Sequence, residues 1–195
     1  MRTLILLRHA KAAQVPGLAD RDRPLTDRGE RDAARAGEEL RAAGLNPDAV
    51  LCSPALRTRR TAELAFPEAE ISFERDIYEA YPEELLRVLQ RVGPEAGTVV
   101  LCGHNPGVHE LSLQLAGGDY GFRPGTFAVI GVEAAWADLW PGDGRLVRVW
   151  EPKEPKEPEQ DLKEPEQDLK DPKHPEDPED PEDPEGDLRE GVSAG

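Results

Sequence analysis

Residues 3–11 read TLILLRHAK, residues 49–57 read AVLCSPALR and residues 98–106 read TVVLCGHNP. Each stretch begins as a short, mostly apolar run of strand length and then passes directly into polar residues. An apolar run without polar alternation is typical of a strand that is covered on both faces of its sheet. The three stretches therefore predict buried strands that end in polar loops.

Helical patterns separate these strands along the chain. Over residues 25–43, four apolar residues recur on one helical face: Ala33, Ala36, Leu40 and Ala43. Thr26 can cap the start of this helix, and Gly44 can end it. Further helices are expected over residues 54–66, 82–92 and 106–115, and further strands over residues 71–73, 126–132 and 145–150. This alternation predicts an α/β fold in which helices flank a mixed, mostly parallel sheet.

The last 45 residues differ in composition from the rest of the chain. The chain has 195 residues and a net charge of −16, and residues 151–195 contribute −12 of it together with 9 of the 19 prolines. KEPEQDL occurs twice over residues 156–169, and PEDPEDPEDPE follows at 175–185. Regular proline breaks helix and sheet, and little apolar surface is left to bury. We therefore expect one domain over residues 1–150 and a disordered acidic tail over 151–195, which either solvates the protein or binds an unknown basic partner.

Composition excludes several classes of protein. An acidic chain lacks the clustered Lys and Arg of a nucleic-acid-binding surface. Its apolar runs are far shorter than the about 20 residues of a membrane span, and its first residues do not form a secretory signal. Cys52 and Cys102 make no disulfide framework and are expected to be small buried residues, with a redox-sensitive thiol as the alternative. The expected compartment is a reducing cytoplasm.

Residues suited to chemistry follow three of the strands. Arg8 and His9 follow the first strand, Arg57 follows the second, and His104 follows the strand at 98–102. In open α/β folds, ligands bind at the carboxyl ends of the strands. If these strands are neighbours in the sheet, two histidines and two arginines converge on one spot.

Two guanidinium and two imidazole groups suit a small dianion such as phosphate. Helices that begin near Pro54 and Pro106 would add amide donors. A neutral imidazole can attack phosphorus and form a phosphohistidine that water later hydrolyses, and a second, protonated imidazole would stabilise the phosphoryl oxygens. No group of residues has metal-ligand spacing and no glycine-rich nucleotide loop is present, so no metal or cofactor is expected.

Four stretches together resemble the histidine phosphatase (phosphoglycerate mutase-like) superfamily and, within it, the SixA-type phosphohistidine phosphatases. They are LRHAKA at 7–12, DRPLTDRG at 22–29, LCSPALRTRRTAE at 51–63 and LCGHNPG at 101–107. The similarity spans roughly residues 1–150, and Ala10 stands where the superfamily more often has Gly. The resemblance implies a three-layer α/β fold and a phosphatase that forms a phosphohistidine intermediate.

The resemblance also implies roles for individual residues. His9 matches the nucleophile, Arg8 the phosphate-binding arginine beside it, and Arg57 a second phosphate clamp. His104 matches the second core histidine, which is expected to be charged when phosphate is bound. Glu79 is the nearest candidate for the acid that protonates the leaving group, with a solvated residue near the next helix as the alternative.

Two other polar residues near these motifs are expected to act elsewhere. Arg23 precedes the helix at 25–43, and a role at the start of that helix or on the surface is expected, with a third cationic contact to phosphate as the alternative. His109 lies five residues after His104, about 140° around a helix, so it should face away from the site.

The short segment between residues 66 and 98 bears on the substrate. It must supply a strand and a helix, which leaves little chain for a lid over the site. An open site favours phosphohistidine on a signalling or phosphotransfer protein as the substrate. The alternatives are a broad-specificity phosphomonoesterase for small molecules and a non-catalytic phosphate-binding module with an acidic interaction arm.

Overall fold

The computed structural model describes residues 1–153, and the predictions for the rest of the tail lie outside the described residues. Six strands form one sheet in the order β3-β2-β4-β1-β5-β6. They are β1 (Arg2–Arg8), β2 (Ala49–Cys52), β3 (Ile71–Phe73), β4 (Thr98–Gly103), β5 (Phe127–Val132) and β6 (Gly144–Trp150). The first four strands run parallel to one another, and β5 is antiparallel to both β1 and β6. The predicted mixed, mostly parallel sheet is confirmed.

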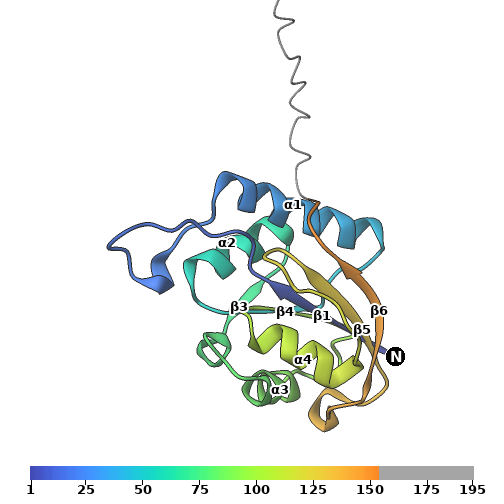
Figure 1. Ribbon diagram of the computed structural model, residues 1–195. Helices are drawn as coiled ribbons and strands as arrows, with labels where there is room; N and C mark the ends of the chain where they lie inside the picture. The colour runs from blue at the N-terminus through green and yellow to red at the C-terminus, as the bar shows by residue number, and fades with distance from the viewer. Residues whose placement is uncertain (154–195) are drawn as a thin grey trace, which may run out of the picture. The chain divides into compact units, whose positions relative to one another are not determined.

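Helices cover both faces of the sheet, so the fold has three layers (Figure 1). α1 (Asp27–Ala42) and α2 (Leu56–Ala65) lie on one face, and α3 (Pro82–Gln90) and α4 (Gly107–Ala116) lie on the other. β1 serves both cores because its side chains alternate: Ile5 and Leu7 pack under α1 and α2, whereas Leu4 and Leu6 pack against α3 and α4. All four residues are fully buried, as the unbroken apolar run predicted.

The ends of α1 follow the predicted pattern. The Thr26 side chain accepts a hydrogen bond from the Gly29 backbone amide, which satisfies one of the unpaired donors at the start of the helix. Gly44 follows the last turn with a φ of 72°, a left-handed conformation that glycine adopts without a steric penalty. Ala33, Ala36 and Leu40 form the buried face of the helix, whereas Ala43, which was expected on that face, lies after its last residue and is exposed.

Three short 3₁₀ helices connect these elements, and the sequence did not predict them: η1 (Asp20–Asp22), η2 (Arg75–Ile77) and η3 (Trp136–Asp138). α2 and α4 also begin slightly later than expected, at Leu56 and Gly107, so Pro54 and Pro106 lie in the turns before these helices. The blue loop that carries η1 projects on the left of Figure 1.

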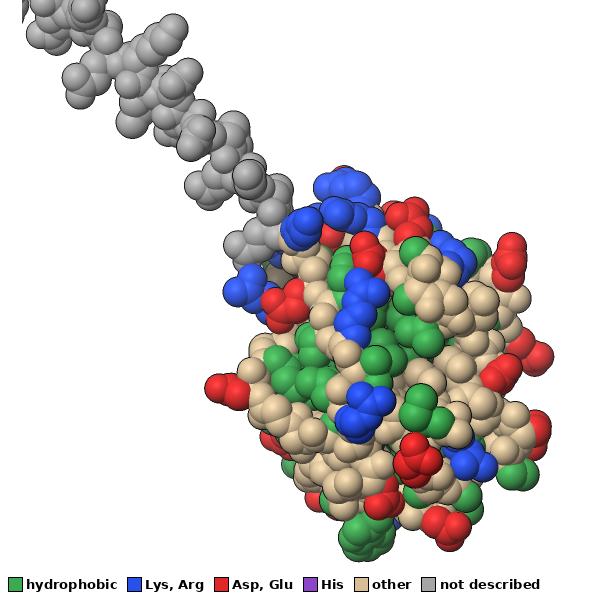
Figure 2. Space-filling model, turned by 90° about the vertical axis from the view of Figure 1, so that its right-hand side faces the viewer, with side chains coloured by type: hydrophobic (Ala, Val, Ile, Leu, Met, Phe, Trp, Pro, Cys, Tyr) green, Lys and Arg blue, Asp and Glu red, His purple; other side chains and the backbone are tan. Residues whose placement is uncertain are grey.

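The edge strand β6 forms much of the face in Figure 2, where basic, acidic and apolar side chains are interspersed. Arg148 on β6 pairs with Glu39 of α1 at 2.6 Å, and Val147 is half-exposed. No histidine of the described residues is visible on this face (Figure 2). Within residues 1–153, no helix has both the length and the apolar character that crossing a bilayer requires.

Candidate active site

Both site histidines follow adjacent parallel strands. β1 and β4 pair so that Arg8 lies opposite Gly103, and the His9 backbone amide donates to the Gly103 carbonyl at 3.0 Å. His9 and His104 therefore leave the sheet side by side, with ring centroids 5.3 Å apart. Arg57 comes from the first turn of α2, directly after β2, which pairs with β4 on its other side.

The structure thus brings the four sequence-predicted residues into one place. They line a cavity of about 410 Å³ together with two carboxylates. The lining thus includes Arg8, His9, Asp20, Arg57, Glu79 and His104. Arg23 and Lys11 also line it. Arg23 therefore lies at the cavity rather than only at the start of α1 or on the surface. A cavity of similar size, about 440 Å³, lies around Arg41 and Phe66 and includes none of these side chains.

The position of Arg8 is fixed by a backbone contact. Its Nη1 donates to the Phe122 carbonyl at 2.7 Å, and burial lowers the pKa of its guanidinium. The buried Nε of Arg8 has no hydrogen-bond partner among the described residues. An arginine that is anchored at one nitrogen and retains donor capacity at another is suited to binding an oxyanion.

The hydrogen bond that His9 makes determines its tautomer. Its Nδ1 lies 2.8 Å from the Ala10 carbonyl oxygen, which can only accept, so Nδ1 carries the proton and Nε2 carries a lone pair. Burial, together with the positive charges of Arg57 and Arg8, lowers the pKa of His9 to about 4, although the bond to Ala10 opposes this shift. His9 is therefore a neutral imidazole at physiological pH.

His104 is held in the opposite tautomer. Its Nδ1 lies 3.3 Å from Arg57 Nη2, which can only donate, so Nδ1 accepts and Nε2 donates to Ser53 Oγ at 2.8 Å. Burial and the proximity of His9 and Arg57 lower the pKa of His104 to about 3. The sequence did not indicate Ser53 as a partner, because its hydroxyl reaches His104 only once β2 and β4 pair.

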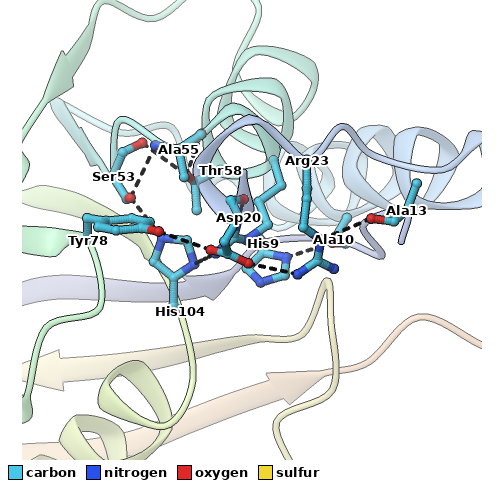
Figure 3. Close-up of polar contacts among 11 residues, drawn as sticks. His9, Ala10, Ala13, Asp20, Arg23, Ser53, Ala55, Thr58, Tyr78 and His104 are labelled. Carbon is cyan, nitrogen blue, oxygen red and sulfur yellow. Dashed lines mark hydrogen bonds and ion pairs between the residues drawn. The ribbon is translucent and has the colours of Figure 1, made fainter. Parts of the chain in front are cut away.

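Asp20 is the main site residue that the sequence reasoning missed. Its carboxylate accepts hydrogen bonds from Arg23 at 2.9 Å, Arg57 at 2.8 Å and the Tyr78 hydroxyl at 3.0 Å (Figure 3). Its backbone carbonyl also accepts from Arg57, at 2.6 Å. Burial acts to raise the pKa of Asp20, but these three donors outweigh it and hold the pKa at about 2.

Glu79 lines the same cavity from the loop before α3. Its φ is 53°, which is a left-handed backbone conformation that is uncommon outside glycine. The side chain is exposed. The structure thus brings Glu79 to the cavity.

Three other candidates lie away from the cavity lining. His109 Nε2 contacts the Tyr120 carbonyl at 2.8 Å, and its ring stacks on Phe122, so it lies away from the cavity lining as its helical spacing predicted. Cys52 and Cys102 are buried register partners on β2 and β4, and both are free thiols. A hydrogen bond with Cys52 and burial raise the pKa of the Cys102 thiol, so it stays protonated and unreactive.

Within residues 1–153, no cluster of His, Cys, Asp or Glu could hold a metal ion.

Comparisons with known proteins identify relatives in sequence and in fold. An uncharacterized protein of Mycobacterium tuberculosis is 37% identical over 158 residues, covering 75% of this chain and all of that protein. Two solved structures of SixA proteins named as candidate phosphohistidine phosphatases are also similar. The one from Nakamurella multipartitia is 34% identical, with a TM-score of 0.73 and coverage of 77% of this chain and 96% of that one. The one from Agrobacterium tumefaciens is 29% identical, with a TM-score of 0.67 and coverage of 77% and 98%.

A family model for the histidine phosphatase superfamily (branch 1) matches residues 4–81. The chain belongs to this superfamily, and its fold is similar to those of the two SixA structures.

Proposed function

We propose that the chain is a phosphatase that transfers a phosphoryl group to His9 and then hydrolyses the phosphoenzyme. The observation that carries this proposal is the fixed tautomer of His9. Its unprotonated Nε2 belongs to a ring that lines a cavity together with three arginines and a second histidine. A neutral imidazole with a depressed pKa is a competent nucleophile across the neutral range.

The reaction has two steps. His9 Nε2 attacks phosphorus, the new N–P bond forms, and the bond to the leaving group breaks as that group takes a proton. Water then attacks phosphorus, the N–P bond breaks, and inorganic phosphate leaves with His9 restored. Glu79 is the proposed proton donor and acceptor in these steps. It is a carboxyl group that lines the cavity, and within residues 1–153 it forms no ion pair.

Arg8 and Arg57 are the proposed clamp for the phosphoryl oxygens. The Asp20 carboxylate supports this assignment, since it is an oxyanion already bound by Arg57, Arg23 and Tyr78. A phosphoryl dianion beside His104 would favour the protonated form of that ring, in which a second N–H can stabilise the transition state.

The proposed substrate is phosphohistidine on a signalling or phosphotransfer protein, which is the activity that the names of the SixA neighbours suggest. The form of the site supports it: residues 74–97 make only η2 and α3, and the apolar face of α3 is buried in the core. No segment of that stretch is left to roof the cavity, so a phosphoryl group on a protein surface can reach it. We place this reaction in a reducing cytoplasm, in keeping with two free cysteines.

The test is a comparison of substrates with the wild-type enzyme and a His9→Ala variant. We expect turnover of a phosphohistidine protein to exceed that of sugar and nucleotide phosphates, and we expect the variant to lose activity on all of them. Faster turnover of small esters would support the alternative, a broad phosphomonoesterase. Binding of vanadate without turnover of any substrate would support a non-catalytic phosphate-binding module.

A further inference from the structure

The connection between α4 and β5 contacts two residues of the candidate active site through one carbonyl group. Phe122 lies in this connection, residues 117–126, which contains no helix or strand. Its carbonyl oxygen accepts hydrogen bonds from Arg8 Nη1 at 2.7 Å and from Asn105 Nδ2 at 2.9 Å. Arg8 and Asn105 both line the site cavity. The position of the Phe122 carbonyl therefore affects where both side chains lie.

A histidine of α4 holds Phe122 and its neighbour in place. Phe122 is only 4% exposed, and its ring stacks on His109 with ring centroids 5.5 Å apart and an interplanar angle of 24°. His109 Nε2 also lies 2.8 Å from the Tyr120 carbonyl oxygen, which can only accept, so Nε2 carries a proton and donates it. One imidazole therefore restrains the connection at two points, through its ring and through its N–H.

The start of the connection has little restraint of its own. Gly117 and Gly118 have φ values of 67° and 111°, and glycine restricts the backbone less than any other residue. Side chains of α4 restrain the chain that follows. The Ser112 hydroxyl pairs with the Tyr120 hydroxyl at 2.9 Å, and His109 makes the two contacts described above. The conformation of the connection thus depends on contacts with α4.

We propose that His109 is a positioning residue for phosphate binding. It acts through Phe122, because it holds the carbonyl group to which Arg8 Nη1 is anchored. The inference rests on the proposed role of Arg8 as a clamp for the phosphoryl oxygens. A guanidinium binds an oxyanion through donors that point in fixed directions, so displacement of its anchor weakens that binding.

The variants separate the two contacts of His109. His109→Phe keeps an aromatic ring against Phe122 and removes the N–H, whereas His109→Gln keeps a donor for Tyr120 and removes the ring. His109→Ala removes both contacts. Gln90→Ala is the matched control, because Gln90 Nε2 donates to the Leu139 carbonyl at 3.0 Å and neither residue lines the cavity. It too removes a side-chain hydrogen bond to a loop carbonyl.

The first measurement is the affinity of the full chain for inorganic phosphate, by titration calorimetry at a temperature where each variant is folded. We expect His109→Ala to bind phosphate about tenfold more weakly than wild type. His109→Phe and His109→Gln should each show a smaller loss, because each retains one contact. Gln90→Ala should bind phosphate like wild type even if its melting temperature falls as far.

The second measurement follows Arg8 itself, and Arg2 at the other end of β1 is an internal reference. Arg2 Nη1 donates to the Ala134 carbonyl at 3.0 Å, so both arginines are anchored in the same way. The Nε atoms of both are buried and have no hydrogen-bond partner among the described residues. In nitrogen-15 spectra we expect His109→Ala to shift the Nε–H signal of Arg8 and to leave that of Arg2 unchanged. Loss of the signal in Arg8→Gln assigns it.

A phosphate affinity in His109→Ala equal to that of wild type would overturn the inference. Weaker binding with an unchanged Arg8 signal, or an equal loss in Gln90→Ala, would also overturn it, because the effect would then not pass through Arg8. His109→Phe and His109→Gln keep the test valid if the alanine variant does not fold.

The calorimetric readout separates this inference from the proposed function because it requires no turnover. Phosphate binding by wild type without turnover of any substrate would refute the phosphatase proposal and leave the inference intact. Absence of phosphate binding by wild type would refute the proposed clamp, and the inference with it.

Discussion

His9 and His104 contact different groups, and these contacts place the ring proton on different nitrogens. A carbonyl oxygen fixes the proton of His9 on Nδ1, and a guanidinium fixes the lone pair of His104 on Nδ1. Both rings are neutral because burial and neighbouring arginines lower their pKa values to about 4 and about 3. An anion that enters between them has one ring to attack it and one ring whose protonation it favours.

These pKa values predict how stability depends on pH. An unfolded histidine titrates near 6.5. As the pH falls from 6.5 towards 4, the unfolded chain therefore binds protons that folded His9 does not, and the unfolding free energy decreases. Between pH 7 and pH 5 we expect His9 to account for about 1–2 kcal/mol of this decrease.

Urea unfolding of wild type and of a His9→Gln variant at both pH values measures this contribution. The variant should lose less stability than wild type over this range. Parallel losses in the two proteins would contradict the depressed pKa of His9.

The contacts of Asp20 lead to a prediction about the affinity of the site for phosphate. Its carboxylate occupies donors of Arg57 and Arg23 that an incoming phosphate would use, and it adds negative charge at the cavity. We therefore expect Asp20→Asn to bind inorganic phosphate and vanadate about fivefold to tenfold more tightly than wild type, as measured by inhibition constants.

Asp22→Asn, which removes the same charge two residues along η1, is the control and should change these constants little. Weaker binding by Asp20→Asn would mean instead that the carboxylate serves mainly to hold Arg57 in place.

At the scale of residues, the sequence was sufficient where a side chain lies directly beyond a strand. Arg8, His9 and His104 could be brought together because parallel strands end at a common edge. Asp20, which lines the cavity from a 3₁₀ turn, could not, and neither could Tyr78, whose hydroxyl donates to Asp20. The paths of the segments that carry these two residues depend on tertiary contacts. An acidic residue three positions before Arg23 was the only signal for Asp20, and such residues are common on protein surfaces.

At the scale of elements, the strands and helices followed from apolar patterning, and the errors lie at their ends. β3 has its predicted bounds, whereas α2 and α4 begin later than their prolines suggested. Each helix start is set by which backbone amides find partners, and pattern alone does not specify those partners.

The close approach of Gly107, at the start of α4, to the loop before α3 leads to a prediction about stability and activity. A Cβ at this position would collide with the Ala80 carbonyl oxygen, which follows Glu79 in the loop lining the cavity. Gly107→Ala should therefore lower the unfolding free energy by about 1–3 kcal/mol and also reduce kcat/KM, because the loop must move.

Gly44→Ala is the control for this prediction. Its φ of 72° makes alanine unfavourable by about 1 kcal/mol, but no atom lies near the new Cβ and the site is not touched. We therefore expect Gly44→Ala to lower the stability of the protein and to leave kcat/KM unchanged. An effect of Gly107→Ala on stability alone would show that contact between α4 and the loop does not position the site.

At the scale of the whole molecule, the site is built entirely within the α/β domain. The residues that line its cavity all fall between Arg8 and Pro124. The predicted boundary at residue 150 stays a prediction, and we note that Pro152, just beyond it, is buried and lies close to Gly125. A truncation is therefore better placed after Lys153.

We expect that truncated chain to turn over an aryl phosphate within about twofold of the full chain and to melt at a similar temperature, since no cavity residue is removed. Side-by-side kinetics and thermal unfolding of the two chains measure this. A loss of activity well beyond that range would assign the acidic tail a part in catalysis.

The proposed function depends on passage of the phosphoryl group through His9. The most direct measurement is to mix the enzyme with labelled phosphohistidine protein, quench rapidly in alkali, which preserves phosphohistidine, and locate the label by peptide mapping. We expect label on His9, and none in a His9→Ala variant. Label on His104 or on any other residue, or full turnover by the variant, would contradict it.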